Sequence, residues 1–209
     1  MLKILGKPSS INVRKVLWTC AELELPYQLE PWATPELPAS APQFLRLNPN
    51  GLVPVLVDHG EVLWESNTIC RYLAGRYPGE HRSLLPQSAM DRAQVEKWMD
   101  WQATELNTAW RYAFMALVRN SAAHADPDAI AASASEWNRL MGLLDGVLAS
   151  TGAYAAGDTF TLADIVLGLS VHRWLSTSIE HAHLPAVQAY YQRLSERPAF
   201  LAHGRNGYP

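Results

Sequence analysis

Cysteine, net charge and long apolar runs are all scarce in this sequence, and each shortage excludes a class of protein. The two cysteines, Cys20 and Cys70, lie far apart in segments with helical patterns, which argues against a disulfide framework or a zinc site and fits a reducing compartment. A formal net charge of −3 over 209 residues offers no electrostatic attraction to nucleic acid or to an anionic membrane. No apolar run is long enough to span a bilayer, and residues 1–6 lack a signal-peptide pattern. We therefore expect a cytoplasmic protein without a metal site.

What the sequence does contain is typical of a folded globular protein: 48% hydrophobic and 18% charged residues, with eight tryptophans. Strand and helix patterns alternate through the first part of the chain. They predict strands at 2–5 and 27–30, a helix at 12–24, a proline-rich loop at 31–42, a hairpin of 53–57 with 61–64, and a helix at 66–77. Pro54 is unusual inside a strand and indicates a sheet edge or a cis peptide bond. Cys20 lies on the apolar face of its helix and is expected in the core.

Beyond a linker at 78–86 the strand patterns stop. One long helix is predicted from residue 91 to about 119, a second from Pro127 to about 149, and two short helices begin at Pro185 and Pro198. Thr161 and Asp164 form a capping-box pattern, so a helix is expected to begin there and to end near residue 175. The predicted fold class is an α/β domain at 1–78 followed by an all-α domain at 87–209.

Four motifs, in a fixed order along the chain, resemble the glutathione S-transferase family, especially its bacterial theta- and nu-like members. They are residues 9–16 (Ser-Ser-Ile-Asn-Val-Arg-Lys-Val), 47–56 (Leu-Asn-Pro-Asn-Gly-Leu-Val-Pro-Val-Leu), 64–73 (Trp-Glu-Ser-Asn-Thr-Ile-Cys-Arg-Tyr-Leu) and 157–164. Each motif alone is weak, but together they make the resemblance cover essentially the whole chain. It implies a thioredoxin-like first domain that binds glutathione and a helical-bundle second domain that supplies an apolar site for a second substrate.

The first motif carries the expected catalytic residues, Ser10 and Asn12, where the first helix begins. A hydroxyl, an amide or a backbone N–H group at the positive end of a helix can lower the pKa of a thiol by stabilising its thiolate. The resemblance assigns the activating hydroxyl to Ser10, and nu-like relatives add Asn12. Both residue types also favour ordinary helix caps, which is the alternative explanation. Which of the two is the main thiolate donor stays open.

The second and third motifs carry the expected glutathione-binding residues. The resemblance implies a cis peptide bond between Val53 and Pro54, and it pairs the cysteinyl backbone of glutathione with the backbone of Val53. Ser66 is expected to cap a helix whose N-terminus attracts the γ-glutamyl carboxylate. Glu65 would accept from the ammonium group beside that carboxylate, which favours an amino-acid head group over a phosphate.

The sequence departs from the family pattern at the glycyl end of glutathione. The segment 31–42 lacks the lysine or histidine that often meets the glycyl carboxylate, and Leu52 stands where many relatives carry lysine. Arg14, Arg111 or Arg119 could supply the charge instead, and the sequence does not choose among them.

Aromatic residues of the helical domain are expected to line the second-substrate site, in the helices that the family uses: Trp110, Tyr112, Phe114 and Trp174. Large apolar side chains are more often part of a core than of a pocket wall. A mostly apolar wall suits a small hydrophobic electrophile. The expected reaction is a detoxifying conjugation in which the thiolate attacks that electrophile.

Two other functions stay open at this point. Ser10 with Asn12 also suggests glutathione-dependent reduction of peroxides or disulfides, and the same fold serves as a non-catalytic glutathione-binding interaction module. Intact Ser10, Glu65 and Ser66 argue against the module. No cysteine stands at the activating position, which disfavours omega- or beta-like chemistry, and the zeta pattern is matched only in part at 11–14. The resemblance also implies a homodimer.

Overall fold

The computed structural model describes residues 1–77 and 83–209, so the expected linker at 78–86 lies largely outside the described residues. The chain divides into two compact units. The first comprises Met1–Leu85 with Pro198–Tyr208, and the second comprises Pro86–Arg197 with Pro209. The C-terminal segment therefore belongs to the first unit, which differs from the expected all-helical domain at 87–209.

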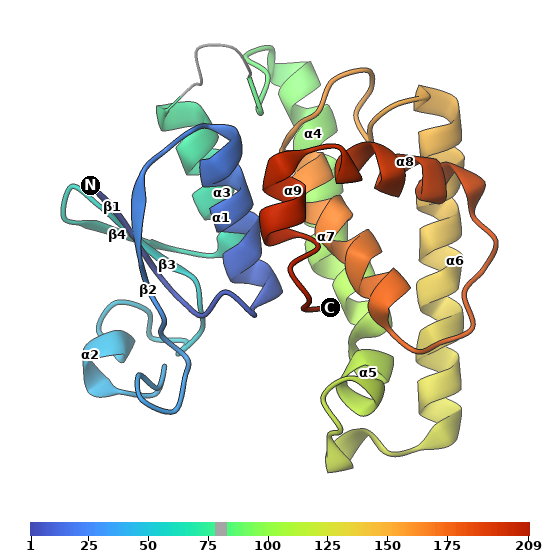
Figure 1. Ribbon diagram of the computed structural model, residues 1–209, viewed down its shortest axis with the longest axis horizontal. Helices are drawn as coiled ribbons and strands as arrows, with labels where there is room; N and C mark the ends of the chain where they lie inside the picture. The colour runs from blue at the N-terminus through green and yellow to red at the C-terminus, as the bar shows by residue number, and fades with distance from the viewer. Residues whose placement is uncertain (78–82) are drawn as a thin grey trace. The chain divides into compact units, whose positions relative to one another are not determined.

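A four-stranded mixed sheet forms the centre of the first unit (Figure 1). Its strands are β1 (Leu2–Leu5), β2 (Tyr27–Glu30), β3 (Val55–Asp58) and β4 (Glu61–Trp64), in the spatial order β2-β1-β3-β4. β1 runs parallel to β2 and antiparallel to β3, which forms a hairpin with β4. The turn residues His59 and Gly60 both have a positive φ, of 50° and 89°, as a two-residue hairpin turn requires. β3 begins two residues later than the predicted strand at 53–57, because Pro54 has no N–H group to donate to the ladder.

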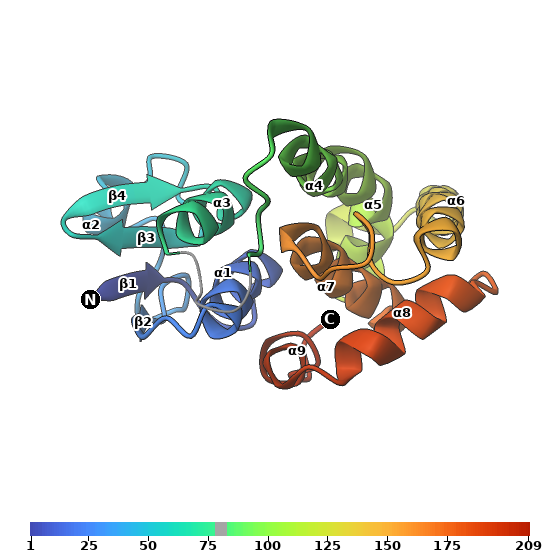
Figure 2. The ribbon, with the colours of Figure 1, turned by 90° about the horizontal axis from the view of Figure 1, so that it is seen from above.

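Alternate residues of the strands face different layers. Leu5 and Val55, which are opposite each other in the register, belong to a buried cluster with Trp32 and with Phe44 of α2 (Pro42–Leu45). The other face of the sheet is covered by α1 (Ile11–Glu22) and α3 (Ser66–Arg76), which lie side by side in Figures 1 and 2. The first unit is therefore the thioredoxin-like α/β layer that the sequence predicts.

α9 (Pro198–His203) joins the first unit by packing against α1. The rings of Trp18 and Phe200 lie 4.9 Å apart, and both side chains are fully buried. Full burial of one aromatic side chain stabilises a fold by roughly 1.5–3 kcal/mol. The sequence pattern predicts this helix, but it does not say which surface buries its aromatic residue.

The regular elements of the second unit are all helices. They are α4 (Ala89–Trp101), a π-helical segment (Gln102–Leu106), α5 (Asn107–Leu117), a 3₁₀ turn (Ala122–His124), α6 (Pro127–Thr151), α7 (Leu162–Ser176) and α8 (Pro185–Ser195). The single α-helix predicted from 91 to 119 is thus divided by a wider π turn. Asn107 Oδ1 accepts from Gln102 Nε2 at 2.9 Å and from Trp110 Nε1 at 3.1 Å across this junction. None of the helices in the described part of the chain is long and apolar enough to cross a membrane.

α7 is the core helix of the second unit, and every residue from Leu162 to Trp174 is buried. Its start is the predicted capping box, in which the Thr161 backbone N–H donates to Asp164 Oδ2 at 2.8 Å. Asp164 is fully buried and also accepts from Ala155 N and from the Tyr190 hydroxyl, both at 3.0 Å. Burial raises the pKa of Asp164 to about 6, although these hydrogen bonds favour its ionised form. The helix start is therefore fixed by one carboxylate that several donors share.

Candidate active site

Ser10 and Asn12 lie at the N-terminus of α1, as the sequence predicts. Gly6 follows β1 and turns the chain, Ser10 occupies the N-cap position, and α1 begins at Ile11. A Cβ atom at position 6 would lie 2.5 Å from a methyl carbon of Val13, so only glycine allows the strand end to approach the helix this closely. The first turn of α1 is consequently held against the end of β1.

The Ser10 hydroxyl does not cap α1. An N-cap side chain normally accepts from a backbone N–H group of the first turn, but among the described residues the Ser10 side chain makes no such hydrogen bond. The first intrahelical bond runs from Arg14 N to the Ser10 carbonyl oxygen, at 3.0 Å. The N–H groups before Arg14 have no acceptor within the helix. Ser10 and Asn12 are half-buried, so a hydroxyl and several N–H donors are available at one positive helix end.

Val53 and Pro54 are joined by a cis peptide bond, which confirms the expectation. The loop before them is held by the buried Asn48, whose Nδ2 donates to Leu52 O at 2.8 Å and whose Oδ1 accepts from Asn50 N at 3.1 Å. Val53 itself is half-buried, and β3 begins two residues later. The backbone of Val53 therefore lies just before a strand, where main-chain groups can pair with an extended peptide.

Glu65 and Ser66 form the sharp corner between β4 and α3. Glu65 has a φ of 74°, a left-handed conformation that is uncommon outside glycine, and its carbonyl oxygen accepts from Ile69 N at 2.9 Å. The prediction that Ser66 caps the helix is wrong by one residue, because Glu65 is the N-cap residue and the buried Ser66 is the first residue of α3. Ser66 still lies at the positive end of the helix, where a carboxylate can bind. The exposed Glu65 side chain adds a negative charge beside it.

Buried polar contacts connect these two helix starts. Lys15 Nζ donates to Asn67 Oδ1 at 3.2 Å, and Thr19 Oγ1 donates to Cys70 Sγ at 3.2 Å about one turn further along both helices. Because Asn67 directly follows Ser66 in the chain, Lys15 fixes the start of α3 relative to α1. Sequence analysis missed both Lys15 and Asn48; the available signal was a polar residue inside a motif that is otherwise apolar or turn-forming.

Neither cysteine is suited to nucleophilic chemistry. Cys20 and Cys70 are both fully buried free thiols on the facing helices α1 and α3. Burial raises the pKa of Cys20 to about 12 and that of Cys70 to about 11. The expectation that Cys20 is a core residue is confirmed, and both thiols stay protonated and out of reach of a substrate at neutral pH.

Of the aromatic candidates in the second unit, Trp110 and Phe114 lie together on α5. Their rings meet edge to face with centroids 5.2 Å apart. The guanidinium carbon of Arg173, on α7, lies 4.5 Å from the centre of the Trp110 ring and 4.1 Å from that of Phe114. Trp110 is half-buried and Phe114 is buried. This arrangement is an aromatic pair stacked on one buried cation.

The other two aromatic candidates have separate surroundings. Tyr112 is half-buried, and its ring meets that of His124 edge to face at 4.9 Å. Trp174 is buried, and its Nε1 donates to Asn138 Oδ1 on α6 at 2.9 Å. The structure therefore does not gather all four aromatic residues into one cluster, and their role as pocket walls stays a prediction.

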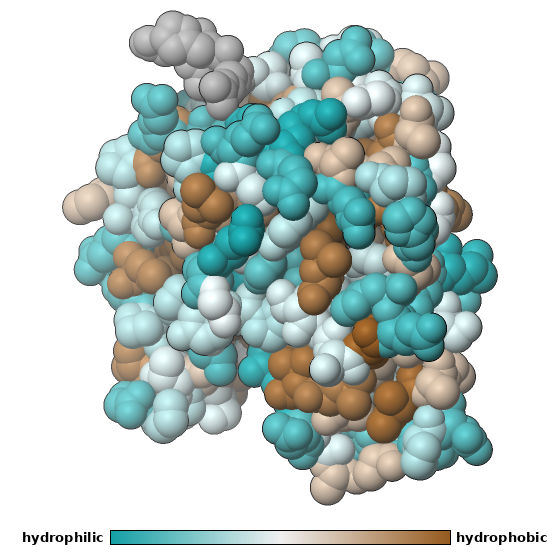
Figure 3. All heavy atoms as spheres, turned by 45° about the vertical axis from the view of Figure 1, so that its right-hand side comes forward, coloured by the Kyte–Doolittle hydropathy of each residue, from teal (hydrophilic) through white to brown (hydrophobic). Residues whose placement is uncertain are grey.

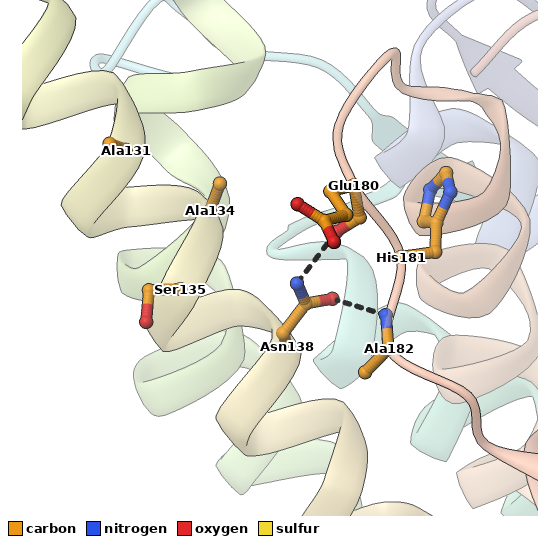
Figure 4. Close-up of a pocket in the computed structure, with 7 residues that line it drawn as sticks. All are labelled: Ala131, Ala134, Ser135, Asn138, Glu180, His181 and Ala182. Atoms are coloured by element: carbon orange, nitrogen blue, oxygen red, sulfur yellow. Dashed lines mark hydrogen bonds between the residues drawn. The ribbon is translucent and has the colours of Figure 1, made fainter.

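The surface of the second unit offers an apolar patch and a pocket. Figure 3 shows hydrophobic side chains gathered over the lower part of this unit, in the region of α5. A pocket of about 440 Å³ opens between α6 and the segment after α7 (Figure 4). None of the aromatic candidates lines it; its lining residues are Ala131, Ala134, Ser135, Asn138, Glu180, His181 and Ala182.

Comparison with known proteins shows to which protein family this chain belongs. Residues 9–76 match the family described as the glutathione S-transferase N-terminal domain, and residues 106–198 match its C-terminal domain. The chain is 41% identical over 202 residues to glutathione S-transferase GstB of Escherichia coli, with 95% of each chain covered. The chain belongs to the glutathione S-transferase family. It is also 34% identical to glutathione S-transferase 3 of Zea mays, with 95% of this chain and 91% of the maize protein covered.

Solved structures of this transferase family share the whole fold. The theta-class glutathione S-transferase of Xanthomonas axonopodis pv. citri with glutathione bound superposes with a TM-score of 0.89 at 37% identity, covering 97% of this chain and 96% of that one. A second such structure, glutathione S-transferase III in its apo form, gives a TM-score of 0.83 at 30% identity. The thioredoxin-like and helical units are therefore the two domains of a glutathione transferase.

Of the three arginines considered for the glycyl carboxylate, the transferase structure argues against Arg14. Its side chain is fully buried, and its guanidinium donates to the C-terminal segment. Arg111 and Arg119 are both exposed residues of the second unit. They stay candidates for this contact.

Proposed function

We propose that this glutathione transferase conjugates glutathione to a small hydrophobic electrophile, with Ser10 as the hydrogen-bond donor that stabilises the thiolate. The observation that carries the proposal is the Ser10 hydroxyl, which stands at the N-cap position of α1 without capping it. A hydroxyl that is not needed by its own helix can donate to a ligand. Its place at the positive helix end favours an anionic acceptor.

The reaction requires little chemistry from the protein itself. A free thiol of the cysteine type titrates near pH ~8.5, so only a small part of glutathione is thiolate at neutral pH. Donation from Ser10, from Asn12 and from the first-turn N–H groups favours the ionised form and lowers that pKa. The thiolate sulfur then attacks an electrophilic carbon, and the leaving group departs with its electron pair. Alignment of the two reactants supplies the remaining acceleration.

Recognition of glutathione rests, in this proposal, on the starts of two helices and one strand. Ser66 and the N-terminal N–H groups of α3 bind the γ-glutamyl carboxylate, and Glu65 accepts from the neighbouring ammonium group. The backbone of Val53, next to cis-Pro54, pairs with the cysteinyl residue. The left-handed conformation of Glu65 supports this role, because such strain is typical of functional positions.

The second substrate is proposed to contact aromatic side chains of the helical unit. Trp110 and Tyr112 are half-buried and so retain surface for a ligand, whereas Phe114 and Trp174 are buried and would act mainly by supporting the wall. Walls of this kind select apolar substrates of fitting shape with few specific hydrogen bonds. The proposed physiological role is detoxification in the cytoplasm.

The decisive experiment titrates the thiol of bound glutathione, by its thiolate absorbance, in the parent protein, in Ser10→Ala and in Asn12→Ala. We expect Ser10→Ala to raise the thiol pKa by about one unit and to slow conjugation at neutral pH about tenfold, with affinity for glutathione nearly unchanged. Raising the pH should restore much of the rate. If Ser10→Ala titrates like the parent and Asn12→Ala does not, the donor is Asn12. If neither variant changes the thiol pKa, the N–H groups of the helix N-terminus alone stabilise the thiolate, and the assignment to Ser10 is wrong.

The same variants separate conjugation from reduction. Asn12 beside Ser10 favours glutathione-dependent reduction of peroxides or disulfides as the second candidate. Parallel assays with an aromatic electrophile and with an organic peroxide give the ratio of the two activities. A peroxide rate that far exceeds the conjugation rate, and that falls in Asn12→Ala, would replace conjugation as the main function.

A homodimer completes the proposal. Two-fold pairing is the commonest assembly of soluble proteins. The exposed and mixed charges around 71–76 and 91–105 suit a polar contact between two copies. Light scattering at micromolar concentration tests it, and a monomeric mass would contradict it.

A further inference from the structure

The C-terminal segment 204–208 lies against the helix that carries Ser10. Arg14 Nη1 donates to Gly204 O at 3.2 Å, to Asn206 Oδ1 at 3.1 Å and to Tyr208 O at 2.7 Å. One nitrogen of a guanidinium has two hydrogens, so these three acceptors share them. The Arg14 side chain is fully buried. Three acceptors that are far from Arg14 in sequence, separated from it by at least 190 positions, thus converge on one atom of α1.

The segment is shaped to bring these acceptors together. α9 ends at His203, and the N–H groups of Gly204 and Arg205 both donate to Phe200 O, at 2.7 and 2.9 Å. A Cβ atom at Gly204 would lie 2.1 Å from the Phe200 ring and 2.8 Å from its carbonyl oxygen, so only glycine fits this turn. Further on, Asn206 Oδ1 accepts from Tyr208 N at 3.4 Å. The turn points the carbonyl groups of 204 and 208 at the same guanidinium.

Arg14 is also one helical turn from Ser10. Its backbone N–H donates to the Ser10 carbonyl oxygen at 3.0 Å, which is the first hydrogen bond of α1. One turn further along the same face, Trp18 packs on Phe200 of α9. Two successive turns of α1 are therefore held by the C-terminal segment and by the helix that leads into it.

We propose that residues 204–208 are a positioning element for thiol activation, which acts by holding Arg14 and so fixing the first turn of α1 where Ser10 and Asn12 lie. The inference rests on the proposed function of that turn. Hydrogen bonds to a thiolate depend strongly on distance and angle, so a small displacement of the helix start weakens them. Arg14 and Asn206 are positioning residues that do not need to touch the substrate.

The test compares the full-length protein with a chain that ends at Arg205 and with Asn206→Ala. The truncation removes the Asn206 and Tyr208 acceptors of Arg14 Nη1 but keeps α9 and the Gly204 carbonyl. We expect it to raise the thiol pKa of bound glutathione by about 0.5–1 unit and to lower kcat at neutral pH about three- to tenfold, with recovery at higher pH. KM for glutathione should change less than about twofold, because the α3 contacts are intact. Asn206→Ala should shift the same quantities in the same direction by less.

Tyr208→Ala is the matched control, because it removes the side chain but keeps the carbonyl group that Arg14 binds. In this variant the thiol of bound glutathione should have the same pKa as in the parent protein. A double variant, Ser10→Ala in the truncated chain, should show less than the sum of the two single pKa shifts if both act on the same hydrogen bond. If the thiol pKa changes in Ser10→Ala but not in the truncated chain, this inference is wrong and the assignment of Ser10 stands. If it changes in the truncated chain but not in Ser10→Ala, the assignment of Ser10 is wrong and this inference stands.

Two further results count against the positioning role. A truncated chain that melts like the parent and keeps the parental thiol pKa contradicts it. So does a pKa shift in Tyr208→Ala as large as that of the truncation, because the Tyr208 side chain, and not the hydrogen bonds to Arg14, would then be responsible. Should the truncated chain fail to fold, Asn206→Ala decides the question with the same titration.

Discussion

The two units of this transferase use buried polar groups in different ways. In the first unit three such groups hold the segments that are proposed to bind glutathione: Asn48 before Val53, Lys15 beside the start of α3, and Arg14 one turn after Ser10. In the second unit the fully buried carboxylate of Asp164 fixes the start of a helix that is buried along almost its entire length. These three polar residues of the first unit therefore support its proposed binding site, whereas Asp164 supports the fold of the second unit.

This difference follows from the ligands that the two units are proposed to bind. A zwitterionic peptide is recognised by N–H and C=O groups at the ends of helices and strands, which must be held in position because hydrogen bonds are directional. A hydrophobic electrophile is recognised by shape and apolar area, which are not directional. Substitutions at the proposed glutathione site of the first unit should therefore change glutathione kinetics, and substitutions at the polar core of the second unit should change stability.

Asp164→Ala should give the largest effect, and this effect should be on the stability of the protein and not on glutathione kinetics. It removes the acceptor of the buried N–H groups of Ala155 and Thr161 and leaves the Tyr190 hydroxyl only the more distant Asp164 carbonyl oxygen, at 3.3 Å. We expect the free energy of unfolding to fall by roughly 3–5 kcal/mol, measured by chemical denaturation with tryptophan fluorescence. Asp145→Ala is the control, because Asp145 accepts from a single N–H group, that of Val187 at the start of α8. Its loss should be roughly 1 kcal/mol, and equal losses in the two variants would contradict the special role of Asp164.

Ser66→Ala and Glu65→Ala should act on glutathione and leave the second substrate unaffected. Each removes a proposed charge-assisted hydrogen bond to the γ-glutamyl end, so binding should weaken by roughly 1–3 kcal/mol, measured by calorimetry. KM for the electrophile should stay close to the parental value. Thr68→Ala, an exposed neighbour on the same turn of α3, is the control. Cysteinylglycine, which lacks the γ-glutamyl group, should bind far more weakly than glutathione; equal binding would show that these two residues are wrongly assigned.

Asp58 should give the smallest effect, and this effect on stability should disappear in acid. It is buried at the end of β3, and its carboxylate accepts from the hydroxyl groups of Tyr72 on α3 and of Tyr77 directly after α3, and from His59 Nδ1, each at 2.7 Å. Burial alone would raise the pKa of Asp58, but these hydrogen bonds outweigh it and hold the pKa below its usual value of 3.8. The stabilisation by Asp58 is therefore complete above that value and is lost as the pH falls through the lower, folded pKa.

The measurement is the free energy of unfolding as a function of pH for the parent and for Asp58→Asn. At neutral pH the variant should be less stable by about 1–2 kcal/mol, because the tyrosine hydroxyl groups lose an ionised acceptor. The difference should shrink as the pH falls below about 4. Tyr72→Phe, which removes one donor to Asp58, should lower the free energy of unfolding by less than Asp58→Asn does. A difference between parent and Asp58→Asn that is constant across this range would exclude ionisation as its source.

Much of the fold could be predicted because its local signals agree with one another. The alternation of strand and helix patterns, the hairpin at His59–Gly60, the capping box of α7 and the prolines that begin α6, α8 and α9 are each set by a few neighbouring residues. The errors are also local: the N-cap residue of α3 is Glu65 and not Ser66, and a π turn interrupts the helix between Trp101 and Asn107. Neither has a pattern of its own in the sequence, because both depend on how the chain is held on either side.

The sequence by itself determined the family, the two layers and the positions of Ser10, Asn12, cis-Pro54, Glu65 and Ser66, because these lie in short contiguous motifs. Only the tertiary structure decided what supports them. The Lys15–Asn67 contact spans 52 positions and the contact of Arg14 with Tyr208 spans 194. Periodicity reports which face of a helix is buried, but a buried lysine or arginine is satisfied by acceptors that chain folding brings from elsewhere. For the same reason the pattern that predicts the C-terminal helix does not show that it packs in the first unit.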